Sequence, residues 1–295
     1  MTREGFYPED QYSNGKSICQ RGAEQHENGF KRRAHAPLTN FPRAATMKAK
    51  QREREGHFVM LETLGPMEIE ARSFQIITEL LGDRTFDPAI APVVKRVIHT
   101  SADFDYADNL VFSPRAVQIG IDALRGGCDI VTDTQMARAG INKTILARLG
   151  GEVHCFMSDP DVAREAKERG VTRAIVSMEH AARLSKPCIF AIGNAPTALI
   201  SLHELMEAGK LSPALIIGVP VGFVNVVESK ELILASDVPH IVARGRKGGS
   251  NIAAAICNAL LYQIERYRAQ NRAKKRSVFH CKDTGNMVSS QVKRV

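Results

Sequence analysis

The sequence of 295 residues contains no tryptophan, and only 6% of its residues are aromatic. It has no uncharged apolar run of about eighteen residues, the length that a transmembrane helix needs, and its opening residues lack the apolar segment of a secretory signal. Six cysteines lie far apart without a CxxC pair, which argues against a disulfide scaffold and against a zinc ribbon. We therefore predict a cytoplasmic protein without membrane contact, whose thiols are free and buried.

Most catalytic and ligand-binding motifs are also absent. The sequence has no GxSxG nucleophile elbow, no HExxH helix, no EF-hand loop, no GxxxxGK[ST] phosphate loop and no GxGxxG dinucleotide fingerprint. Asp103, Asp105 and Asp108 follow one another closely, but their spacing fits no metal site. We interpret them as an acidic loop that caps the next helix, and we predict no protein-bound metal ion.

Acidic residues are fewer than basic ones, and the formal net charge is +8. This charge is unevenly distributed: residues 1–57 contain eleven Lys or Arg against seven Asp or Glu, and residues 265–295 contain nine against two. Residues 58–264 therefore have a net charge of −3. Because no zinc finger, RNP sequence or aromatic-interleaved basic strand accompanies the basic ends, we predict no nucleic-acid binding.

The chain divides by composition into three parts. Residues 1–57 mix glycine, proline, amides and charge with almost no apolar periodicity, which predicts a disordered extension. Residues 58–267 have the apolar patterning of one globular domain, and residues 268–295 form a basic tail. The hydrophobic content of 44% is high enough for a domain of that length to bury a core.

The globular part alternates short apolar runs with helical stretches, the pattern of a parallel sheet covered by helices. Apolar residues at helical spacing predict two early helices, one around residues 74–81 and one that begins at Pro92 and ends near His99. The predicted strands are 129–134, 152–157, 188–193, 214–219 and 240–243. The predicted later helices are 113–125, 134–149, 159–169, 172–184, 195–208 and 250–267. We expect a single α/β domain with a three-layer αβα arrangement and a mainly parallel sheet.

Small and polar residues follow four of these strands. Ligands bind beyond the carboxyl ends of the strands in such sheets, so this rim is the predicted ligand site. One rim sequence, GRKGGSN, brings two cations and backbone N–H groups to the start of a helix, which suits a carboxylate or phosphate. The candidate binding residues on the rim are Thr132, Asp133, Asn194, Gly218, Arg246 and Lys247.

His99 differs from the other eight histidines. It stands at the end of a predicted amphipathic helix and is followed by the small or hydroxyl residues Thr100, Ser101 and Ala102. Histidine is the side chain best suited to exchange a proton at neutral pH. Its position leaves two interpretations open at this point, a catalytic histidine and a structural one.

Several long segments, in order, resemble the precorrin-8 methylmutase family of corrin biosynthesis. They are SFQIITEL, VVKRVIHTSADFDYA, VTDTQMARAGINK, CFMSDPDVA, GNAPTAL, IIGVPVGFVNVVESKE and GRKGGSNIAAAICNALLY, and they span residues 68 to about 264. The resemblance implies an isomerase that moves a methyl group from carbon-11 to carbon-12 of a late corrin macrocycle. It also implies a homodimer that needs no dissociable cofactor and whose partners are a corrinoid substrate and product.

The resemblance carries over to particular residues. His99 matches the family's catalytic histidine, Ser73 and Arg173 match substrate-contacting positions, and Arg96 is a plausible further contact. The family commonly continues TRS where this chain has Thr172-Arg173-Ala174, and the missing hydroxyl puts one substrate hydrogen bond in doubt.

The resemblance leaves the metal in the substrate open. The HTSADFDYA, TDT and GINK segments are most similar to members that act on cobalt-precorrin-8 and give cobyrinic acid. The alternative substrate is metal-free precorrin-8X, which gives hydrogenobyrinic acid. Two other classes also stay open: a tetrapyrrole-binding protein without turnover and a nucleotide-dependent oxidoreductase.

Overall fold

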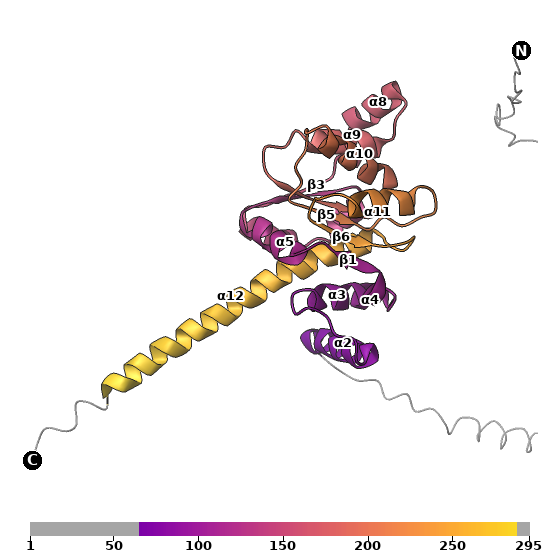
Figure 1. The fold of residues 1–295 in the computed structure, drawn as a ribbon. Helices are drawn as coiled ribbons and strands as arrows, with labels where there is room; N and C mark the ends of the chain where they lie inside the picture. The colour runs from indigo at the N-terminus through magenta and orange to yellow at the C-terminus, as the bar shows by residue number, and fades with distance from the viewer. Residues whose placement is uncertain (1–64, 288–295) are drawn as a thin grey trace, which may run out of the picture. The chain divides into compact units, whose positions relative to one another are not determined.

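The computed structural model describes residues 65–287, in which a six-stranded sheet lies between two layers of helices (Figure 1). The predicted extension 1–57 lies outside the described residues. The strand order is β1-β6-β5-β4-β2-β3, and every neighbouring pair is parallel except β1 with β6. The strands are β1 (Leu110–Phe112), β2 (Asp129–Thr132), β3 (Val153–His154), β4 (Cys188–Ile192), β5 (Leu215–Gly218) and β6 (His240–Ala243).

Helices cover both faces of this sheet (Figure 1). On one face a core cluster joins the strands to α3 (Ala91–Ser101), α5 (Ala116–Arg125), α6 (Gln135–Gly140), α7 (Lys143–Arg148) and α12 (Ser250–Met287). On the other face a second cluster joins them to α9 (Arg173–Ala181), α10 (Pro196–Glu207) and α11 (Val226–Leu234). The remaining helices are α2 (Pro66–Leu81), α4 (Tyr106–Asn109), η1 (Phe156–Ser158) and α8 (Pro160–Arg169). The predicted three-layer αβα fold is confirmed.

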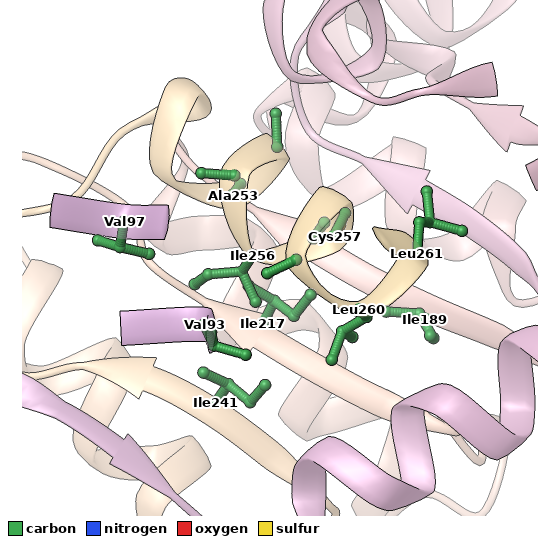
Figure 2. Packing of buried hydrophobic residues seen from close by; sticks show 14 of the residues in the cluster. Val93, Val97, Ile189, Ile217, Ile241, Ala253, Ile256, Cys257, Leu260 and Leu261 are labelled. Carbon is green, nitrogen blue, oxygen red and sulfur yellow. The ribbon is translucent and has the colours of Figure 1, made fainter. Parts of the chain in front are cut away.

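The two layers follow from the alternation of side chains along each strand. In β4, Ile189 packs with the α3 and α12 cluster, whereas its neighbour Phe190 packs with the α9 and α10 cluster, because successive side chains point to opposite faces. Figure 2 shows Ile189 and Ile217 from the sheet against Ile256 and Leu260 of α12. All four are fully buried, and each such side chain stabilises the fold by about 1.5–3 kcal/mol.

The structure corrects several predicted elements. The predicted helix 134–149 is two helices, because Asn142 caps a new one by accepting a hydrogen bond from the N–H of Ile145. The predicted strand 152–157 ends at His154 and continues as η1. The last helix extends to Met287, well beyond the predicted residue 267. Strand β1 and helix α11 were not predicted.

Four of the six cysteines lie in the described part of the chain, and they have the expected state. Cys128, Cys155, Cys188 and Cys257 are free and buried, and burial raises the pKa of the Cys128 thiol to about 12. No helix among the described residues is long and apolar enough to span a membrane. Within residues 65–287, no group of three or more His, Cys, Asp or Glu side chains is arranged to hold a metal ion.

Candidate functional site

The loops at the carboxyl ends of the strands pack directly on one another, and glycines permit the contact. A Cβ atom on Gly193, after β4, would lie 2.7 Å from Cα of Ser250, where α12 begins. A Cβ atom on Gly248, after β6, would lie 2.1 Å from the carbonyl oxygen of Val219, after β5. Real Cβ atoms do not approach that closely, so the rim requires glycine at both positions. The rim is therefore one continuous packed surface.

Asp133 anchors this rim from inside. Its carboxylate accepts hydrogen bonds from the backbone N–H groups of Gly193, Asn194 and Ala195, at 2.9, 2.7 and 2.6 Å. The side chain is fully buried. Burial raises the pKa of the Asp133 carboxyl, and the three N–H donors oppose that rise. Asp133 thus holds the loop after β4 in place and presents no free oxygen at the surface.

Two other predicted binding residues are enclosed in the same way. The Thr132 hydroxyl donates to the carbonyl oxygens of Thr134 and His154, each at 3.2 Å, and the residue is fully buried. Gly218 is buried at the end of β5, where a Cβ atom would lie 3.3 Å from Val242. The Thr132 side chain therefore bonds to the ends of neighbouring segments, and Gly218 presents only backbone atoms at a buried position.

Lys247 connects the rim to the segment that follows His99. Its Nζ atom lies 2.6 Å from carboxylate oxygens of both Asp103 and Asp105. The ammonium group of Lys247 lowers the pKa of Asp103 by hydrogen bonding, and the two carboxylates raise the pKa of Lys247. The predicted acidic loop therefore acts as the partner of a rim cation and is not an isolated helix cap.

His99 is exposed close to the end of α3, where the chain turns sharply at Ala102 in the left-handed region (φ 54°). Its ring stacks on Phe74 of α2, with the ring centroids 5.3 Å apart. One turn earlier, the Arg96 guanidinium lies 5.2 Å from the Phe74 ring and 4.6 Å from the Tyr262 ring, and its Nη2 is 2.5 Å from Glu70. Packing fixes both side chains, while the imidazole stays accessible.

Four predicted contacts remain, and three of them are exposed. Arg173 begins α9, is exposed, and makes one long hydrogen bond of 3.4 Å to the carbonyl oxygen of Met157. Asn194 and Arg246 are also exposed. Ser73 is half-buried on α2, and its hydroxyl donates 2.8 Å to the carbonyl oxygen of Ile69. The structure thus offers an accessible histidine and the accessible cations Arg173 and Arg246, groups suited to an anionic ligand that undergoes proton transfer.

The comparison with known families decides what kind of protein has this rim. The model of the precorrin-8X methylmutase family matches residues 68–263, which include every strand and all candidate residues. The chain belongs to the precorrin-8X methylmutase family. This methylmutase is accordingly an isomerase.

Individual relatives agree with that assignment. The cobalt-precorrin-8 methylmutase of Priestia megaterium is 48% identical over 198 residues, which are 67% of this chain and 88% of that protein. The cobalt-precorrin-8 methylmutase of Salmonella typhimurium is 48% identical over 207 residues, 68% of this chain and 96% of that protein. A crystal structure of the precorrin-8X methylmutase from Thermus thermophilus superposes with a TM-score of 0.61 at 39% identity, covering 66% of this chain and 96% of that one.

Ala174, where this methylmutase departs from the TRS pattern, faces the core. It is 3% exposed and packs in the α9 and α10 cluster. A serine hydroxyl at this position would therefore point away from the rim, so the expected loss of a substrate hydrogen bond does not follow from the geometry. Thr172, in contrast, caps α9 and donates a hydrogen bond to Thr197, 3.1 Å away in the first turn of α10.

Sequence reasoning missed one residue that shapes the rim of the methylmutase. Lys230 of α11 is fully buried, and its Nζ donates hydrogen bonds to the carbonyl oxygens of Gly245 and Lys247 at 2.7 and 2.9 Å. Burial lowers the pKa of Lys230 to about 8. These bonds hold the loop on both sides of Arg246. The available signal was the spacing of Lys230, four residues after Val226 and three before Ile233, which places it on the apolar face of a helix. A lysine is rarely buried without a specific partner.

Proposed function

We propose that this methylmutase moves the methyl group from carbon-11 to carbon-12 of cobalt-precorrin-8 and so forms cobyrinic acid. The observation that carries the proposal is the match of the family model across residues 68–263. The cobalt-containing substrate is favoured because the relatives that are 48% identical act on cobalt-precorrin-8 by name. The same rearrangement of metal-free precorrin-8X is the alternative.

The proposed chemistry needs positioning and one proton donor. The bond from carbon-11 to the methyl carbon breaks as the bond from carbon-12 to the same carbon forms, so the reaction consumes no other reactant. A hydrogen bond or proton from His99 to the macrocycle draws electron density out of the conjugated system and lowers the barrier. The proton returns to His99 when the product forms. Such acid assistance contributes about 10²–10⁴-fold to a rate.

The exposed cations supply affinity in this proposal. A late corrinoid carries several acetate and propionate side chains, and their carboxylates suit Arg173 and Arg246. Asn194 adds an amide donor on the same rim. The buried Thr132, Asp133, Gly218 and Lys230 fix the loops on which these side chains stand. Holding the arms of the substrate also orients the migrating methyl group.

We further propose that the enzyme acts as a homodimer and needs no dissociable cofactor, as the family resemblance implies. Exposed apolar side chains support the dimer: Phe223 and Val224 in the loop after β5 are 84% and 78% exposed, and such surface favours burial by a second copy. Sedimentation of the purified chain tests the dimer. The cytoplasmic location remains a prediction from the sequence, which cell fractionation tests.

The direct test is incubation of the purified chain with cobalt-precorrin-8 and, separately, with metal-free precorrin-8X, followed by product absorption spectra. We expect conversion of the cobalt substrate to cobyrinic acid, and faster conversion of the metal-free ring would assign the alternative substrate. Binding of both rings without conversion would indicate a tetrapyrrole carrier. In a parallel melting experiment, stabilisation by NAD(P) alone would support the oxidoreductase class and contradict the proposal.

A further inference from the structure

A cavity lies behind the ring on which His99 stacks. It has a volume of about 390 Å³ and lies between α2, α3 and the middle of α12. Phe74 lines it and also stacks on His99, so the cavity and the exposed imidazole share one wall. The volume is within the range of small-molecule sites. Among the candidate site residues, Arg96 alone lines it.

The cavity is lined by cations and by no acid. Lys95, Arg96 and Arg266 all line it, and none of the described residues that line it is Asp or Glu. Arg96 is held by Glu70 from outside the lining. Lys95 donates one hydrogen bond to Thr78, at 2.9 Å, which leaves further donors on its ammonium group. Arg266 forms no ion pair with any residue in the described range.

A buried donor in the same lining lacks an acceptor. The Nε2 atom of Gln263 is buried and has no hydrogen-bond partner among the described residues. Buried polar groups in folded proteins are almost always paired, and each exception calls for an explanation. If the Gln263 amide turns toward the cavity, an acceptor oxygen from a bound ligand pairs this donor. The rest of the wall consists of alanine, proline and aromatic side chains, which suit an apolar stem.

We propose that this cavity binds a carboxylate group on a short apolar stem, with Lys95, Gln263 and Arg266 as its donors. Two sources have this chemistry: an acetate or propionate arm of the corrinoid, and a free aliphatic acid. The corrinoid source rests on the proposed function above, and the free acid does not. Arg96 shapes the wall, because Phe74 and Tyr262 hold its guanidinium on both sides.

The test uses the double variant Lys95→Met/Arg266→Met and the single variant Gln263→Leu in the full chain. The matched control is Lys143→Met/Lys210→Met, which removes two exposed lysines away from the cavity. Isothermal titration measures binding of cobyrinic acid, of a corrinoid whose carboxylates are all amidated, and of glutarate. Retained melting temperature and dimer content verify that each variant is folded.

If a corrinoid arm occupies the cavity, the double variant loses about 10- to 100-fold in affinity for cobyrinic acid and keeps its affinity for the amidated corrinoid. If a free acid occupies it, glutarate binds the parent and the control but not the double variant, while corrinoid affinity is unchanged. Either result supports the carboxylate site. Parent-like binding of both cobyrinic acid and glutarate by the double variant, or an equal loss for acid and amidated corrinoids, overturns it.

The test of the cavity site and the test of the proposed function can fail independently of each other. Turnover of cobalt-precorrin-8 by the parent tests the function alone. If the parent has no turnover, glutarate binding still tests the cavity. If turnover is normal and the double variant binds every probe as the parent does, the function stands and the cavity site is wrong.

Discussion

At the scale of single residues, exposure separates the proposed binding groups from groups that support the loops. Arg173 has one long hydrogen bond and an exposed side chain, so its guanidinium is available for a carboxylate. Asp133 stands at a comparable rim position, but three backbone N–H groups occupy its carboxylate. The sequence suggested both as binding residues, Asp133 from its place after a predicted strand and Arg173 from the family resemblance. Which way each side chain points depends on the exact strand end, which composition does not encode.

Arg173→Ala should weaken corrinoid binding by about 1.5–3 kcal/mol, because it removes a charge-assisted partner of a substrate carboxylate. Arg173→Lys should recover part of that loss, since a point charge does not reproduce a bidentate fork. Titration with cobyrinic acid measures both variants, and Arg164→Ala, an exposed arginine of α8, is the control. Parent-like affinity in both Arg173 variants would make this residue structural.

Lys230 gives a prediction about pH. Its pKa is lowered from 10.5 to about 8 by burial, so between these values the unfolded chain binds more protons at this site than the folded one. The contribution of Lys230 to stability therefore rises as the pH increases from 8 to 10.5, by an amount on the order of 3 kcal/mol. Below pH 8, Lys230 is protonated in both the folded and the unfolded chain. The folded chain then bears the full free-energy cost of burying the ammonium charge.

Urea unfolding of the parent and of Lys230→Met at pH 7, 8, 9 and 10 measures this effect. The free energy of unfolding of the parent should rise relative to that of the variant across the upper part of the range. The variant should also bind cobyrinic acid more weakly, because the carbonyl oxygens of Gly245 and Lys247 lose their donor and the loop around Arg246 loosens. A constant difference between the two proteins across pH would show that Lys230 does not titrate in this range.

At the scale of elements, loop contacts that require glycine hold the rim together. Gly248→Ala would place a Cβ atom 2.1 Å from the Val219 carbonyl oxygen, a backbone atom that cannot move away cheaply. We expect a loss of about 1–3 kcal/mol in stability together with weaker corrinoid binding. The control is Gly209→Ala, which has a positive φ of 65° but open space around the new Cβ atom. Its strain should cost stability alone, and equal losses of binding in both variants would contradict the role of the packed loops.

Sequence periodicity located the elements that bury a clear apolar stripe. All five parallel strands lie inside predicted runs, because β2, β4, β5 and β6 are buried along their whole length and are mainly apolar. The edge strand β3 has only two residues, so its predicted run was too long. Strand β1 escaped detection because it has three residues and pairs at the sheet edge in the antiparallel direction. Helix α11 escaped because its N-cap, Asn225, has a φ of 56° and makes no side-chain capping bond. The charged interior residue Lys230 also interrupts its apolar pattern.

At the scale of the whole molecule, the family match ends at residue 263 while α12 continues to Met287. The excess positive charge lies in the two ends of the chain, outside the family region. We predict that a shortened chain of residues 61–267 folds and keeps its isomerase activity, because the core clusters lie within it. Circular dichroism and turnover compare it with the full chain. Insoluble protein or lost turnover would mean that one end completes the fold or the site.

The proposed mechanism depends on the exposed imidazole of His99 near the end of α3. Single-turnover conversion of cobalt-precorrin-8 by His99→Ala, with cobyrinic acid binding measured in parallel, tests it most directly. We expect a loss of at least about 10² in rate with nearly unchanged binding, because the histidine acts mainly in the transition state. His99→Asn separates the roles: activity would show that a hydrogen bond suffices, and inactivity with intact binding would support proton transfer. Normal turnover by His99→Ala would contradict the mechanism.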